Sequence, residues 1–224
     1  MQLWKRFVDI IKDSMKDIII VGASGLGREI ADWIEDINEV APTWNILGFI
    51  DDNLKALDGY PSDFKVIGTI SEWEPKPAEW FACGLAFPEV KRHCVGLLKS
   101  KGAQFATLIH PTAIISKFSE IGEGTIITQR SGLNTNTKVG KFVTILESGM
   151  GHDSSIGDFS TLSGRCNVNG HVSIGNDVYV SCGVSIAPSK KIGDGAKLGI
   201  GSIVISNVKP GVTVFGNPAK KIDF

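Results

Sequence analysis

An aliphatic side chain recurs every six residues through the second half of the chain, with a single step of five residues between Ile145 and Met150. The recurring positions are Ile115, Ile121, Ile127, Leu133, Val139, Ile145, Met150, Ile156, Leu162, Val168, Ile174, Val180, Ile186, Ile192, Leu198 and Val204. This period matches neither the turn of an α-helix nor the two-residue alternation of a simple strand. It is typical of a solenoid whose short strands each send one large side chain inward before a turn. Three such strands close a triangular coil of 18 residues, so residues n and n+18 are expected in one column.

A second recurring position supports the same coil. Four residues after most aliphatic positions stands a small or β-branched residue, namely Thr125, Ser131, Thr137, Val143, Ser154, Ser160, Cys166, Val172, Val178, Val184, Ala196 and Ser202. The chain also has 26 glycines. Because they lack the one-in-three spacing of collagen, they are expected at recurrent turns.

The first half of the chain instead alternates strands with helices. Residues 18–21 predict a buried strand, followed by a glycine turn over 22–27 and a helix over 28–34. Further apolar segments lie at 46–50, 66–67, 80–84 and 105–109, with a second helix expected from Pro88 to about Lys101. This order predicts a small parallel, Rossmann-like α/β sheet. The expected domains are an N-terminal extension over 1–15, the α/β domain over 16–109 and the solenoid over 110–224.

The glycine turn reads G-x-x-G-x-G, which differs from the G-x-G-x-x-G spacing of dinucleotide-binding folds and gives a nicotinamide cofactor only weak support. The amides at the start of a helix still favour an anion such as a phosphate. The candidate contacts are Gly22, Ser24, Gly25, Leu26 and Gly27. The alternative is that the glycines only permit close packing of the helix on the strand.

Two acidic residues, Asp51 and Asp52, come directly after the second predicted strand. Ligands of open parallel sheets bind at the carboxyl ends of the strands, where a carboxylate accepts hydrogen bonds from ribose hydroxyls or base N–H groups. The alternative for each aspartate is a cap of a turn or helix.

Charge and cysteine spacing exclude other classes. The chain carries 23 Lys and Arg against 24 Asp and Glu, a formal net charge of -1, which argues against a nucleic-acid partner. The four cysteines form no C-x-x-C pair, so we expect reduced thiols in a cytoplasmic protein and no zinc. Residues 1–15 predict an amphipathic helix that Asp9 and Asp13 distinguish from a signal peptide, and no stable membrane insertion is expected.

The repeats resemble those of the hexapeptide acyltransferases, a resemblance that implies a left-handed parallel β-helix. The segments IIIVGASGLGREI, GFIDDN and LIHPTAIIS and the closing G-x-P-A of residues 216–219 extend the resemblance from about Lys16 to Phe224. The chain is similar to the NeuD/PglD-like family, typified by sialic acid O-acetyltransferase and UDP-4-amino-sugar N-acetyltransferase. The resemblance makes the glycine turn, Asp51 and Asp52 candidate nucleotide-sugar contacts.

His152 lies at the single interruption of the repeat, where a side chain is available for a function other than packing. The family motif H-D/E-x-x-I-G-D matches residues 152–158 and implies that His152 is the general base, with Asp153 fixing its tautomer. Adding 18 to 152 gives Gly170, whose backbone amide the resemblance assigns to the oxyanion. We leave open whether His110 or His171 contributes.

The resemblance also implies acetyl-CoA as co-substrate. Residues expected near it are Ala187, Pro188, Ser206, Gly199 and Lys220. Two positions depart from the family pattern: Leu26 stands where relatives often carry histidine, and Thr161 stands nine residues after His152, where a second histidine would contact the coenzyme.

The resemblance implies a homotrimeric acetyltransferase that acts on a nucleotide-linked amino sugar in bacterial surface-glycan synthesis. We expect no metal and a direct attack on the thioester. The same residues leave two alternative functions open. One is O-acetylation of a free sugar acid such as sialic acid, and the other is a catalytically silent trimeric scaffold that binds nucleotide sugars. A γ-class carbonic anhydrase is disfavoured because His110, His152 and His171 do not share a column, and an NAD-dependent reductase because no Tyr-x-x-x-Lys set is found.

Overall fold

The computed structural model describes residues 15–222 and divides the chain into two compact units. The first unit comprises the chain up to Leu85 together with His93–Ala106, and the second comprises Ala86–Arg92 with the chain from Thr107 onward. The helix expected over residues 1–15 lies outside the described residues apart from Met15. Within residues 15–222, no helix has both the length and the apolar character needed to cross a membrane.

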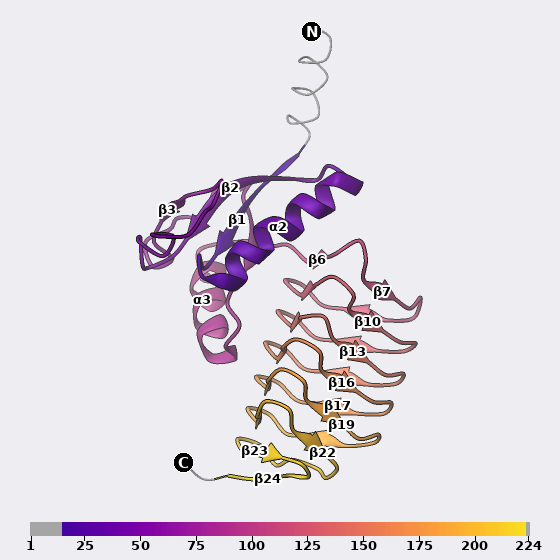
Figure 1. Cartoon of the computed structure of the whole chain (residues 1–224). Coiled ribbons are helices and arrows are strands. Elements are labelled where there is room, and N and C mark those ends of the chain that lie inside the picture. Colours follow the sequence, from indigo (N-terminus) through magenta and orange to yellow (C-terminus); the bar gives the residue numbers. More distant parts are fainter. Residues whose placement is uncertain (1–14, 223–224) are drawn as a thin grey trace, which may run out of the picture. The chain divides into compact units, whose positions relative to one another are not determined.

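The first unit is a five-stranded parallel sheet with the strand order β3-β2-β1-β4-β5, as expected for an α/β domain (Figure 1). Its elements are β1 (Lys16–Val21), α2 (Gly25–Val40), β2 (Trp44–Ile50), β3 (Val66–Gly68), β4 (Trp80–Cys83), α3 (Pro88–Ser100) and β5 (Gln104–Phe105). The central strand β1 is hydrophobic on both faces, and Ile18, Ile19, Ile20 and Val21 are fully buried. Because β1 pairs with β2 on one side and β4 on the other, the glycine turn leaves the sheet where the strand order reverses.

The apolar segment 105–109 is divided between the two units. Strand β5 ends at Phe105, whereas Leu108–Ile109 forms β6 and pairs with β9 of the second unit. The six-residue period therefore starts one repeat earlier than the sequence pattern indicated. Strand β6, Leu108–Ile109, ends six residues before Ile115, the first position of that pattern.

The second unit is a parallel β-helix with three faces, seen edge-on as a stack of coils in Figure 1. Face 1 contains β7 (Ile114–Ile115), β10 (Gly132–Leu133), β13 (Gly149–Met150), β16 (Asn167–Val168), β19 (Ser185–Ile186) and β22 (Ile203–Val204). Face 2 contains β8 (Glu120–Ile121), β11 (Lys138–Val139), β14 (Ser155–Ile156), β17 (Ser173–Ile174) and β20 (Lys191–Ile192). Face 3 contains β6, β9 (Ile126–Ile127), β12 (Thr144–Ile145), β15 (Thr161–Leu162), β18 (Tyr179–Val180), β21 (Lys197–Leu198), β23 (Thr213–Gly216) and β24 (Ala219–Lys221).

The predicted inward positions form one continuous core along this unit, from Ile127 through Ile156 to Val204, each at most 5% exposed. The turns between faces bend at residues with a positive φ, which are Arg130, Asn136, Phe142, Glu147, Asp153, Phe159, Arg165, His171, Asp177 and Ser189 besides several glycines. The one shortened step lies in the turn from β12 to β13. The pairs across it are therefore 17 residues apart on every face, namely Leu133 with Met150, Val139 with Ile156 and Ile145 with Leu162.

The segment Ala86–Arg92 packs against the outer side of face 3. Lys91 is fully buried, and its ammonium group donates to Phe142 O at 3.0 Å, Thr144 Oγ1 at 2.9 Å and Thr161 Oγ1 at 3.0 Å. The Thr161 hydroxyl in turn donates to Ala86 O at 2.7 Å. Thr161, which stands where the family pattern has a second histidine, is thus fully buried on face 3.

Candidate active site

His152 and Asp153 lie in the turn from face 1 to face 2, directly after β13. His152 Nδ1 lies 2.8 Å from Asp153 Oδ2, and both side chains are well exposed. Asp153 can turn back to the preceding histidine because its backbone has φ 57°. The structure thus brings together the two residues that the motif singled out.

Asp153 is held as an ionised carboxylate. Its Oδ1 accepts from Asn136 Nδ2 at 2.8 Å, and this bond, followed by the one with His152, lowers the pKa of Asp153 below its usual range. A carboxylate can only accept hydrogen bonds, so Nδ1 of His152 carries the proton in this pair. In the neutral ring, Nε2 then keeps its lone pair.

Gly170 lies in the next coil against the imidazole, as the n+18 spacing predicted. A Cβ atom added to Gly170 would lie 2.7 Å from His152 Nε2, so the absence of a side chain leaves room for the ring. The amide of His171, one residue on, donates to His152 O at 3.0 Å and ties the two coils together.

The amide of Gly170 is open because the next residue of its column offers it no acceptor. In the turn from face 2 to face 3, each column residue caps the amide one coil before it: Asn176 Oδ1 accepts from Asp158 N at 2.8 Å, and Asp194 Oδ1 from Asn176 N at 2.9 Å. The residue after Gly170 in its column is Pro188, which has no side-chain acceptor. Within the described chain the Gly170 amide makes no hydrogen bond, so it is available to a ligand.

His171 is a neighbour that sequence reasoning left unassigned. Its ring meets that of His152 edge-on, with centroids 5.0 Å apart, and its Nε2 lies 3.8 Å from Asp153 Oδ2. The signal was present in the spacing, because 171 is 18 residues after 153.

A pocket of about 450 Å³ opens beside these residues along face 1. It is lined by Gly132, Asn134, Gly149, Met150, Gly151, His152, Asn167, Val168, Asn169, Gly170, His171 and Pro188. Added Cβ atoms at Gly132 and Gly149 would meet nothing within 4 Å, so these two glycines hollow the strand surface. The lining combines amide side chains with histidines and contains no lysine or arginine from the described residues.

The residues expected near acetyl-CoA divide between two regions. The turns that follow the strands of face 1, one of which holds His152, also contain Ala187, Pro188 and Ser206. Of these three residues, Pro188 lines the pocket. Gly199 and Lys220 instead follow or lie on strands of face 3, where Gly199 packs closely on Phe215. Within one chain the structure does not bring these two residues to His152.

The glycine turn of the first unit contains two glycines that allow close packing and three backbone amides that have no hydrogen-bond partner in the described chain. A Cβ atom at Gly27 would collide with Gly22 O, and one at Gly22 with the side chain of Leu85, so these two glycines serve close packing. The exposed N-cap Ser24 makes no capping bond through its side chain, and a Cβ at Gly25 would meet nothing within 4 Å. The amides of Gly25, Leu26 and Gly27 have no partner within the described chain, as an anion site at a helix start requires.

Asp51 and Asp52 make the cap contacts that the sequence left open as an alternative. Asp51 accepts from the amides of Ala23 and Asn53, each at 2.8 Å, and Asp52 accepts from the amide and hydroxyl of Ser71. Asp51 thereby fixes the glycine turn against the end of β2.

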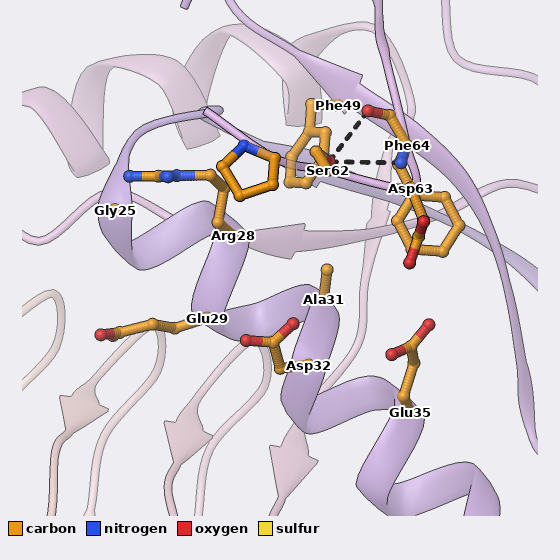
Figure 2. Close-up of a pocket in the computed structure, with 11 residues that line it drawn as sticks. Gly25, Arg28, Glu29, Ala31, Asp32, Glu35, Phe49, Ser62, Asp63 and Phe64 are labelled. Carbon is orange, nitrogen blue, oxygen red and sulfur yellow. Dashed lines mark hydrogen bonds between the residues drawn. The ribbon is translucent and has the colours of Figure 1, made fainter. Parts of the chain in front are cut away.

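A second pocket lies along α2 in the same unit, with a volume of about 430 Å³ (Figure 2). Figure 2 shows Asp32, Glu35 and Asp63 around one side of it and Arg28 at the other. Burial, and then the nearby Asp32 and Asp63, raise the pKa of Glu35. Of the predicted nucleotide-sugar contacts, Gly25 lines this pocket.

The pocket beside His152 is lined neither by His110 nor by any of the four cysteines. His110 is buried, and its Nδ1 lies 2.9 Å from Thr112 Oγ1, so it has a local structural partner. All four cysteines are free, and only Cys182 is exposed. In the described chain, one group of three or more His, Cys, Asp or Glu has donor atoms close enough for a shared cation, and it consists of His152, Asp153 and His171.

Comparison with known proteins identifies both units. A family model described as the PglD N-terminal domain matches residues 17–95. A GDP-perosamine N-acetyltransferase of Escherichia coli O157:H7 is 30% identical over 213 residues, which are 91% of this chain and 95% of that protein.

Solved structures agree with this match. WeeI from Acinetobacter baumannii AYE is 30% identical with a TM-score of 0.79, covering 92% of this chain and 99% of its own. The acetyltransferase domain of PglB from Neisseria gonorrhoeae FA1090 in complex with acetyl coenzyme A has the same fold, with a TM-score of 0.81 at 23% identity over 93% of this chain and 100% of that one. The chain therefore belongs to the NeuD/PglD-like family of hexapeptide-repeat sugar acetyltransferases and is an acyltransferase.

Proposed function

We propose that this enzyme transfers the acetyl group of acetyl-CoA to the amino group of a nucleotide-linked amino sugar, as part of bacterial surface-glycan synthesis. The observation that carries the proposal is the pairing of His152 with Asp153 beside the open amide of Gly170. The relative that matches over 95% of its own length is named a GDP-perosamine N-acetyltransferase, which favours a nucleotide-linked amine as acceptor.

His152 is the proposed general base. Its Nε2, left with a lone pair by the bond to Asp153, takes a proton from the attacking amine as the new C–N bond forms. The amide of Gly170 donates to the thioester oxygen as negative charge develops there. Collapse of the tetrahedral intermediate breaks the C–S bond, and the thiolate of CoA leaves and takes up a proton.

The pocket favours a neutral sugar ring over a sugar acid. Proteins recognise carboxylates chiefly with arginine or lysine, and neither lines the pocket among the described residues. The amide side chains of Asn134, Asn167 and Asn169 suit hydroxyl groups instead. The same lining disfavours O-acetylation of a free sialic acid.

The proposal includes a homotrimer, a cytoplasmic location and binding of the nucleotide phosphates at the amides of Gly25–Gly27. Support for the location comes from four free cysteines, which fit a reducing compartment. In the trimer, Gly199 and Lys220 of a neighbouring subunit would contact the coenzyme, in line with their distance from His152 within one chain.

The test is an assay of CoA release with acetyl-CoA and a panel of GDP-, UDP-, dTDP- and CMP-linked amino sugars. We expect at least one to be acetylated and His152→Ala to lose at least about 10²-fold in rate, the scale of a removed general base. No turnover with any amino sugar would support the silent scaffold, and an unchanged rate in the variant would remove His152 from the mechanism.

A further inference from the structure

We propose that His152, Asp153 and His171 form a binding site for a divalent transition cation such as Zn²⁺, and that this cation reversibly inhibits the enzyme. The site uses a residue, His171, to which the acetyl-transfer chemistry assigns no role. The inhibitory consequence rests on the proposed function of His152, whereas the binding itself does not.

The donor atoms of the three residues lie close to the spacing that one ion needs. All three residues offer a ligand atom within 4.8 Å of the others. His152 Nδ1 and Asp153 Oδ2 are 2.8 Å apart, and His171 Nε2 is 3.8 Å from the same oxygen. Ligands at zinc bond lengths in a tetrahedral arrangement are about 3.4 Å apart. These distances lie on both sides of that value, so small rotations of exposed side chains complete the site.

The donor set selects the class of cation. Two imidazoles and one carboxylate suit Zn²⁺, Ni²⁺ or Cu²⁺, whereas Mg²⁺ and Ca²⁺ prefer oxygen donors throughout. Asn136 Nδ2 donates to Asp153 Oδ1 at 2.8 Å and orients the carboxylate from behind, as outer partners of metal ligands do. With three protein ligands on an exposed corner, the fourth position is open to solvent.

Binding of the cation removes the base whichever nitrogen of His152 it takes. At Nε2 the ion occupies the lone pair that accepts the proton from the amine. At Nδ1 it displaces the bond to Asp153 and leaves the ring proton on Nε2, which then cannot accept another. Both arrangements predict inhibition that a chelator reverses.

The first test measures ZnCl₂ binding to the full chain by titration against a chromogenic chelator, with MgCl₂ for comparison. We expect one Zn²⁺ per chain and no competition by Mg²⁺. In His171→Asn, binding should weaken by at least about 10-fold, since loss of even an outer partner has that effect. Asparagine suits the positive φ of 59° at this position, so the variant keeps the turn.

Two matched variants control for adventitious binding. His93 and Cys182 are exposed donors outside the group, and His93→Asn and Cys182→Ser should bind Zn²⁺ as the parent chain does. Equal binding by His171→Asn and the parent, or loss of binding in either control alone, would overturn the site.

The second test adds ZnCl₂ to the acetyl-transfer assay, with each variant compared with its own rate without metal. We expect inhibition of the parent, recovery on addition of EDTA, and at least about 10-fold more Zn²⁺ for the same inhibition of His171→Asn. Zinc binding without inhibition of an active enzyme would refute the inhibitory role. Zinc binding by a chain that acetylates no amino sugar would refute the proposed function and leave the site intact.

Discussion

The Asp153 carboxylate determines which nitrogen of His152 carries the proton in the neutral ring. The hydrogen bonds from Asn136 and His152 lower its pKa, so the carboxylate stays ionised well below neutral pH and keeps the proton of His152 on Nδ1. Nε2 is thereby left as the acceptor beside Gly170. The proposed chemistry depends on one short contact, between His152 Nδ1 and Asp153 Oδ2 at 2.8 Å.

Replacing Asp153 by asparagine keeps the size of the side chain but removes the charge that fixes the tautomer of His152. An amide offers both a donor and an acceptor to Nδ1, so the tautomer is no longer fixed, and we expect kcat to fall at least about 10²-fold. The KM for acetyl-CoA should change little, because the side chain is not among the pocket-lining residues. Steady-state kinetics of Asp153→Asn checks this, and a kcat equal to that of the parent would contradict the proposed tautomer control.

Two cysteines of the β-helix should differ sharply in reactivity. Burial raises the pKa of the Cys166 thiol to about 11, whereas Cys182 is exposed. Iodoacetamide at pH 8 followed by mass spectrometry should modify Cys182 in the folded protein and leave Cys166 unmodified until denaturant is added.

The raised pKa of Cys166 also makes the stability of the folded protein depend on pH. A thiol whose pKa is raised in the folded state keeps its proton where the unfolded chain loses it. The contribution of Cys166 is therefore present below the pKa of an unfolded cysteine and is lost as pH rises toward about 11. Labelling of native Cys166 at pH 8 would contradict both statements.

At the scale of elements, the turn from face 2 to face 3 and the turn from face 1 to face 2 differ in whether a side chain caps the amide of the preceding coil. Asp158, Asn176 and Asp194 form a ladder of caps between faces 2 and 3, each accepting from the amide of the coil before it. The equivalent column between faces 1 and 2 has Gly170 and Pro188, and its amide stays open. The Gly170 amide thus stays open because Pro188 offers it no side-chain acceptor.

Extending the ladder of caps to the turn from face 1 to face 2 should abolish the proposed oxyanion site at the Gly170 amide. In Pro188→Asn, the new side chain is placed to accept from Gly170 N as Asn176 accepts from Asp158 N. We expect kcat to fall about 10²- to 10³-fold, as when an oxyanion donor is removed. Pro188→Ala, which adds no acceptor, is the control, and equal losses in the two variants would argue against a role of the Gly170 amide.

The contact between segment 86–92 and face 3 should be a major source of stability. Lys91→Ala removes the ammonium group that donates hydrogen bonds to the hydroxyls of Thr144 and Thr161, and it removes a fully buried side chain. We expect a loss of about 2–5 kcal/mol in the free energy of unfolding, measured with urea. Lys197→Ala on the same face, where the side chain is exposed, should change it by less than about 0.5 kcal/mol.

At the scale of the whole molecule, the sequence predicted both units from their different periods. The six-residue repeat indicated the β-helix, its column spacing and the position of Gly170 beside His152, because each coil repeats the last. It did not reveal that segment 86–92 packs on face 3, since Lys91 and Thr161 are distant in sequence and share no pattern. It also missed β6, because Leu108 and Ile109 extend an apolar run that begins in another sheet.

The most direct test of the proposed chemistry is a crystal structure of the enzyme with acetyl-CoA. We predict that the thioester oxygen accepts from the amide of Gly170 at about 2.7–3.1 Å, with the reactive carbon on the Nε2 side of His152. A thioester bound in another turn or on another face would contradict this prediction.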